Sequence, residues 1–167
     1  ELYDIETDSE VYRKGIHLLP EISLEGDPEE VFKKIYRRTG ELLEHDKLLT
    51  FIGGEHSVSI GIIKAFSEKF SDLTVLQLDA HTDLRPEYLG SPYNHACAMH
   101  EASKNTRLIQ VGIRSMDSLE LNYFDRSKCI FAEEMQDNDD WIDRVLSLLG
   151  GDLYLTVDMD VFDPSIM

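Results

Sequence analysis

Three side chains of metal-binding type stand at every second position in LQLDAHTDLR, residues 76–85. Asp79, His81 and Asp83 directly follow the apolar run at residues 73–78, which is typical of a strand that crosses a core. Desolvated polar side chains are costly, and three of them at the end of a buried strand have no obvious structural purpose. Carboxylate and imidazole groups bind metal ions, so the spacing indicates a metal site.

Further residues of the same kind follow two other predicted strands. His56 comes after a Gly-Gly turn, and Asp158 and Asp160 lie in the last strand. Taken singly, His56 would usually be a capping or packing residue, and the Asp pair would usually be solvated loop acids. In an α/β sheet, however, ligands bind beyond the carboxyl ends of the strands, and residues two apart on a strand share a face. Together, the four Asp and two His favour one shared site.

The charge of such a site predicts what it binds. Four carboxylates at a partly buried edge would repel one another and raise their own pKa values unless positive charge lay among them. Two divalent cations would balance the four negative charges and make a water between them acidic enough to yield hydroxide at neutral pH. Oxygen donors with two imidazoles favour Mn over Zn. The residues therefore predict two Mn²⁺ ions.

Alternating strand and helix patterns predict how the site is positioned. Asp27 and Pro28, with Glu30 three residues after Asp27, mark the start of a helix over residues 27–43. Apolar periodicity predicts two more helices, at residues 56–70 and at residues 139–151, the latter closed by Gly150. Apolar runs predict strands at residues 48–52, 73–78, 107–113, 128–132 and 152–160. This order indicates a three-layer, doubly wound α/β fold around a mostly parallel sheet.

Composition narrows the class of protein. The chain has 167 residues, 42% of them hydrophobic, and a net charge of −17 from 33 acidic and 16 basic residues. The acidic balance argues against a nucleic-acid partner and for cationic ligands or metal ions. No apolar stretch approaches the ~20 residues that cross a bilayer, so we expect no membrane partner. Cys97 and Cys129 match no zinc or redox spacing, which favours reduced packing thiols in a cytoplasmic protein.

The ends of the chain indicate a piece of a longer protein. The sequence begins at Glu1 and stops at DPSIM, directly after a motif. We therefore expect residues 1–167 to form one partial α/β domain.

Three motifs carry a resemblance to a known family. GGEHS at 53–57, DAHTDLR at 79–85 and TVDMDVFDP at 156–164 resemble, in order and spacing, the signature motifs of the ureohydrolases, which include arginases and agmatinases. The resemblance covers nearly the whole chain and implies an arginase-like fold that lacks its N-terminal strand and its C-terminal part. It also implies that the six Mn ligands are His56, Asp79, His81, Asp83, Asp158 and Asp160.

The resemblance also implies a catalytic residue. His95, in SPYNHACAMHEA, matches the family's proton shuttle, which protonates the departing amine; a packing or ligand-supporting role is the alternative. His100 is a weaker candidate, because it falls in what is predicted to be the following helix.

The expected function is hydrolysis of a guanidino group. The stretch LRPEYLGSPYNHACAM is more similar to agmatinases than to arginases, which implies a small cationic guanidine such as agmatine as substrate and urea and putrescine as products. Alternatives are an arginase, a guanidinobutyrase, or a non-catalytic metal-binding or assembly subunit of the same fold. The family also implies a homo-oligomer, and the residues missing from the family pattern imply that this piece alone is inactive.

Overall fold

A computed structural model of the protein describes residues 3–136 and 138–162. Its helices are α1 (Pro28–Leu43), α2 (Val58–Lys69), α3 (His100–Asn105) and α4 (Asp140–Leu148). Its strands are β1 (Leu73–Leu78), β2 (Arg107–Ile113), β3 (Cys129–Phe131) and β4 (Asp152–Val157). Short 3-10 turns lie at Val11–Lys14, His95–Cys97, Ser118–Asn122, Arg126–Lys128, Ala132–Met135 and Met159–Val161. Within the described ranges, no helix has the length and apolar character needed to cross a membrane.

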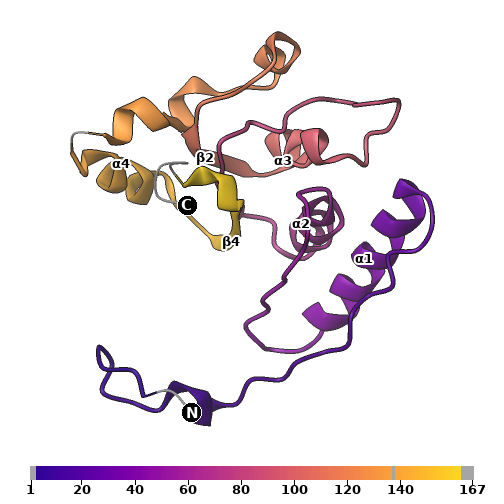
Figure 1. Ribbon diagram of the computed structural model, residues 1–167, viewed down its shortest axis with the longest axis vertical. Helices are drawn as coiled ribbons and strands as arrows, with labels where there is room; N and C mark the ends of the chain where they lie inside the picture. Colours follow the sequence, from indigo (N-terminus) through magenta and orange to yellow (C-terminus); the bar gives the residue numbers. More distant parts are fainter. Residues whose placement is uncertain (1–2, 137, 163–167) are drawn as a thin grey trace.

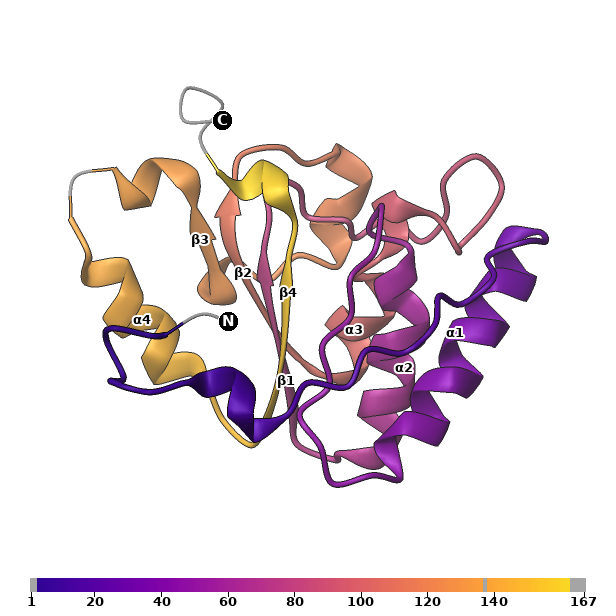
Figure 2. The same ribbon diagram turned by 60° about the horizontal axis from the view of Figure 1, so that its bottom comes forward.

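The strands form one parallel sheet in the order β3-β2-β1-β4. Figure 2 shows the sheet nearly edge-on, with α1, α2 and α3 on one side and α4 on the other. The predicted α/β class, three layers and parallel sheet are confirmed. The chain passes through α3, β2, β3 and α4 between β1 and β4, so two neighbouring strands come from distant parts of the sequence.

The first helix forms where its start signal predicts. The Glu30 amide donates to Asp27 Oδ1 at 2.9 Å, and the Asp27 amide donates to Glu30 Oε2 at 3.3 Å. These bonds satisfy amides that a helix N-terminus leaves without partners. The helix buries Ile35 and Leu43 in the layer that it shares with α2.

The core lies on both faces of the sheet. Leu73 and Val75 of β1 belong to the apolar layer beneath α2 and α3, whereas Leu76 and Leu78 pack with Ile109, Val111, Ile130 and Val145 on the α4 side. This alternation follows from the two-residue period of a strand. β4 is one of the two edge strands, and its Leu153, Leu155 and Val157 are each about half exposed (49%, 51% and 47%).

Residues 48–52 do not form the predicted strand. They have no regular secondary structure and lie outside the hydrogen-bonded sheet, and Leu48 and Ile52 are 97% and 95% exposed. A strand requires a neighbouring strand to bond its amides and carbonyls, and an apolar run does not supply one.

Other element boundaries differ by a few residues. β3 and β4 are shorter than predicted, and β4 passes into a 3-10 turn at Met159–Val161. α4 ends at Leu148 with an extended Leu149 cap, so Gly150 does not close it. Gly151 instead adopts the left-handed conformation, with φ +58°, in the turn into β4.

The N-terminal stretch lies apart from the layered body. Figure 1 shows the described residues up to the turn at Val11–Lys14 lying away from the helices and the sheet, after which the chain runs up beside α1. The apolar side chains of this stretch are exposed, for example Ile16 and Leu18 at 84% and 89%. Cys97 and Cys129, by contrast, are buried free thiols, as expected of packing residues.

Candidate metal centre

The predicted ligands gather at the carboxyl edge of the sheet. Asp79 directly follows β1, and Asp158 directly follows β4. The last residues of these strands, Leu78 and Val157, are register partners in the sheet. The backbone continues the sheet pairing through both residues: the Asp79 amide donates to Val111 O at 3.0 Å and the Asp158 amide to Leu78 O at 2.9 Å. Two neighbouring strand ends therefore deliver carboxylates side by side.

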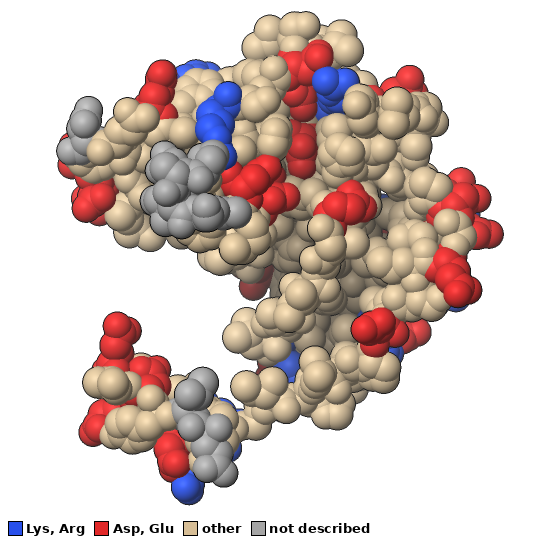
Figure 3. Space-filling view, in the orientation of Figure 1, with Lys and Arg blue, Asp and Glu red and all other residues tan. Residues whose placement is uncertain are grey.

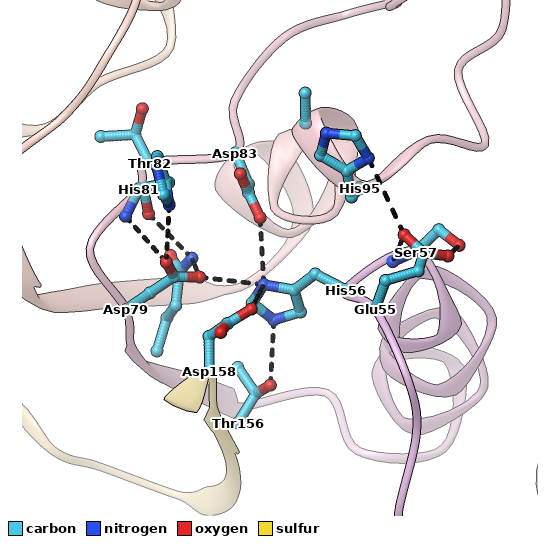
Figure 4. A network of polar contacts seen from close by, with 12 residues as sticks. Glu55, His56, Ser57, Asp79, His81, Thr82, Asp83, His95, Thr156 and Asp158 are labelled. Atoms are coloured by element: carbon cyan, nitrogen blue, oxygen red, sulfur yellow. Dashed lines mark hydrogen bonds and ion pairs between the residues drawn. The ribbon is translucent and has the colours of Figure 1, made fainter. Parts of the chain in front are cut away.

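His56 brings three carboxylates to one nitrogen. It precedes α2, and its side chain is only 5% exposed. Its Nδ1 lies 2.9 Å from Asp79 Oδ2, 3.0 Å from Asp83 Oδ2 and 3.8 Å from Asp158 Oδ2. Figure 4 shows these side chains pointing toward the imidazole. His56, Asp79 and Asp83 form a compact group with ligand atoms within 4.8 Å of one another, whereas Asp158 stands at its margin.

A second group lies on the other side of Asp79. His81 Nδ1 is 3.0 Å from Asp160 Oδ2 and 3.6 Å from Asp79 Oδ1. The ligand atoms of these three residues again lie within 4.8 Å of one another. Asp79 thus directs one carboxylate oxygen toward each imidazole, and the two groups share it.

The environment of His56 fits a cation. Its Nε2 lies 3.0 Å from Thr156 Oγ1, and donation of a proton there would leave the Nδ1 lone pair facing the carboxylates. Among the described residues, the buried Nδ1 has no hydrogen-bond partner of acceptable geometry. A lone pair facing carboxylate oxygens is stabilised only by positive charge between them. The donor set therefore fits a metal ion, with a proton as the substitute when no metal is bound.

The pKa values reflect this electrostatic environment without metal. Burial alone would lower the pKa of His56, but the carboxylates of Asp79 and Asp83 raise it from 6.5 to about 10. Burial raises the pKa of Asp83. Burial also acts to raise the pKa of Asp79, yet His56 and the His81 amide together lower it. The cluster thus holds a positive charge at His56.

Asp83 occupies an unusual backbone conformation. Its φ is +52°, in the left-handed region, which is uncommon for residues other than Gly, although Asp tolerates it better than most. The surrounding structure enforces this geometry: the Met99 amide donates to Asp83 O at 2.9 Å. Strain of this kind concentrates at functional sites, and here it accompanies a carboxylate directed at His56.

His95 lies at the rim of the same pocket. The pocket has a volume of about 450 Å³ and is lined by both groups of ligands and by His95. His95 Nδ1 is 3.9 Å from Glu55 Oε2 (Figure 4). The His95 ring meets the Tyr88 ring edge-on, with ring centroids 5.7 Å apart. It belongs to neither ligand group. His100, in contrast, is buried, with Nδ1 2.9 Å from Leu84 O, and serves the packing of α3.

The pocket is strongly acidic. Besides the ligands, Glu55, Asp117 and Glu120 line it, and its Arg85 pairs with Asp117 at 2.9 Å. On the face shown in Figure 3, acidic side chains outnumber basic ones, and several gather beside the end of β4. Glu120 was not identified from the sequence as part of the site.

Two supporting residues in the strands were also missed. Thr156 contacts His56, and Gln77 donates from Nε2 to Asp79 Oδ2 at 2.7 Å. Each stands two residues before a predicted ligand, and the strand period places residues two apart on one face. A polar residue at that position of an apolar strand was the available signal.

The whole sequence, residues 1–167, matches the model of the arginase family. The N(1)-aminopropylagmatine ureohydrolase of Synechocystis sp. is 37% identical over 131 residues, which are 75% of this chain and 42% of that protein. The agmatinase of Bacillus subtilis is 31% identical over 84% of this chain and 49% of its own length. The crystal structure of the agmatine ureohydrolase of Thermoplasma volcanium superposes with a TM-score of 0.84 at 27% identity, covering 99% of this chain and 57% of that one. The chain thus spans about half the length of the relatives that it matches.

Proposed function

Since this chain belongs to the arginase family, we propose that the protein hydrolyses the guanidino group of a small cationic guanidine such as agmatine, releasing urea and an amine. The observation that carries the proposal is the sharing of Asp79 by two His/Asp groups, one of which contains the buried His56 Nδ1, an atom without a hydrogen-bond partner in the described part of the chain. One carboxylate directed at two cation positions is the arrangement that a two-metal hydrolase needs.

We assign two Mn²⁺ ions to these positions. His56 and Asp83 would hold one ion, His81 and Asp160 the other, and Asp79 both. Asp158, whose Oδ2 is 3.8 Å from His56 Nδ1, would complete the set on the β4 side. Carboxylate-rich donors with imidazole suit Mn²⁺. When bound, the ions would supply Lewis acidity and lower the pKa of water toward neutrality.

His95 supplies the proton in this proposal. Its ring lies at the pocket rim and belongs to neither ligand group of the described residues, so metal binding leaves it available to the leaving amine. The Glu55 carboxylate lies nearby, with Oε2 3.9 Å from His95 Nδ1. A general acid at this place protonates the amine as its bond to the guanidino carbon breaks.

The acidic lining supports a cationic substrate. Glu55, Asp117 and Glu120 add negative charge beside the ligands, and Arg85 is already paired with Asp117. The named relatives act on agmatine or N(1)-aminopropylagmatine, and both compounds carry amines in place of the amino-acid end of arginine. We therefore propose a decarboxylated guanidine as the substrate in preference to arginine or guanidinobutyrate. The homo-oligomer implied by the family stays a prediction.

Urea release by the full-length protein tests the proposal. Agmatine, N(1)-aminopropylagmatine, arginine and guanidinobutyrate are compared, each with added Mn²⁺ and with chelator. We expect Mn-dependent urea from agmatine or its aminopropyl derivative and little from the other two. The Asp79→Asn variant, which removes the shared anionic ligand, serves as the inactive control. No urea from any of the four substrates would favour a non-catalytic metal-binding or assembly subunit.

A further inference from the structure

Two buried glutamines lie directly beneath the ligands. Gln77 of β1 and Gln110 of β2 are register partners in the parallel sheet, and they are 0% and 4% exposed. A buried amide is stable only when its donors and acceptor have partners. The bonds of this pair therefore indicate what it does.

The amides form a directed chain that ends on the shared ligand. Gln110 Nε2 donates to Gln77 Oε1 at 2.6 Å and to Thr82 O at 2.8 Å. Gln77 Nε2 in turn donates to Asp79 Oδ2 at 2.7 Å and to His81 O at 3.1 Å. Because a carboxylate only accepts, Gln77 must turn its NH₂ toward Asp79, and its oxygen then faces the Gln110 NH₂. Each amide orientation thus requires the next.

This chain fixes the carboxylate plane of Asp79. Oδ2 receives the Gln77 bond and faces His56, while Oδ1 receives the His81 amide at 2.7 Å and faces the His81 ring. Each oxygen therefore has one N–H donor and one side open toward an imidazole. Rotation of the carboxylate would break both bonds in a site where Asp79 is 1% exposed.

We propose that Gln77 and Gln110 are positioning residues that hold Asp79 in the orientation in which it serves both metal ions. The inference rests on the proposed metal site. The two side-chain amides also donate to the backbone carbonyls of His81 and Thr82, so they connect the segment that contains His81 and Asp83 to strands β1 and β2. Residues that orient a metal ligand in this way are worth roughly 10–100-fold in metal affinity.

Mn²⁺ binding to the full-length protein tests the proposal without an activity measurement. Electron paramagnetic resonance counts free Mn²⁺ during titration of the parent and of Gln77→Met and Gln110→Met, which keep side-chain length and remove the donors. Because Asp79 faces both groups, we expect Gln77→Met to weaken both binding steps about 10–100-fold. Gln110→Met should weaken both binding steps less, because it removes the hydrogen bond that orients Gln77 and no bond to Asp79 itself. The control, Thr74→Val, removes a buried hydrogen bond of β1 to Gly150 O, far from the ligands, and should bind as the parent does.

The outcomes separate this inference from the proposed function. Circular dichroism and thermal unfolding without metal identify variants that have not folded; if Gln77→Met is one, Gln110→Met carries the test. A parent that binds no Mn²⁺ would overturn the metal site and the inference with it. A parent that binds Mn²⁺ while folded Gln77→Met binds equally well would overturn the inference alone. Parent-like binding by folded Gln110→Met would refute the role assigned to Gln110.

Discussion

Protons should compete with Mn²⁺ at His56 well above the pH range of an ordinary histidine. Without metal, the carboxylates of Asp79 and Asp83 outweigh burial and hold the His56 pKa at about 10 rather than 6.5. A metal ion needs the Nδ1 lone pair and must displace that proton. With ordinary His and Asp pKa values, the affinity for Mn²⁺ would fall as the pH drops through about 6.5. The raised pKa of His56 shifts this competition between protons and Mn²⁺ to higher pH.

The size of this effect on Mn²⁺ affinity follows from the raised pKa of His56. At pH 7, about three units below the folded pKa, the proton lowers the apparent affinity at the His56 position roughly 10³-fold. Affinity should therefore rise about tenfold per pH unit between about pH 6.5 and 8.5. The proton also stabilises the metal-free fold, because the folded pKa is raised. That contribution, about 5 kcal/mol at most, is complete below pH 6.5 and is lost as the pH rises through about 10.

Calorimetry in two buffers of different ionisation heat measures the protons released. At about pH 7.5 we expect about one proton per ion bound at His56, whereas a histidine of ordinary pKa would release about a tenth of one. His56→Asn should release about one proton fewer than the parent and bind more weakly. His95→Asn, at the pocket rim, should keep it. Affinity that is independent of pH, with no proton released by the parent, would refute the reasoning.

Three further predictions concern single side chains. His95→Ala should lower turnover of the full-length enzyme roughly 10²–10⁴-fold with unchanged Mn content, measured by urea release and metal analysis; loss of metal as well would make His95 a ligand. Thr156→Val removes the partner of the buried His56 Nε2 and should lower the free energy of unfolding by about 1–3 kcal/mol in urea titrations. The same change at the exposed Thr50 should have almost no effect, and equal losses would contradict the assigned bond. Asp27→Ala removes the α1 cap and should cost about 1 kcal/mol by the same measurement, whereas an unchanged unfolding curve would show that the cap contributes nothing.

Local signals in the sequence were sufficient for the helices and for the sheet core. The Asp27 and Glu30 pair marks the start of α1, and the apolar runs at 73–78 and 107–113 are β1 and β2. These signals act over a few residues, so the sequence carries them in full. The run at 48–52 carries the same apolar signal, yet a strand depends on a partner that local pattern cannot identify.

The site divides in the same way. The sequence by itself determined that Asp and His side chains follow the strands, and it predicted that they are metal ligands, because Asp-x-His-x-Asp after an apolar run leaves few structural explanations. Only the tertiary structure decided that β4 lies beside β1, that Asp79 faces both His56 and His81, and that Gln77 supports it. The first of these relations joins strands that lie more than seventy residues apart in the sequence, and all of them depend on packing and hydrogen bonding in the folded sheet, which spacing along the chain does not specify.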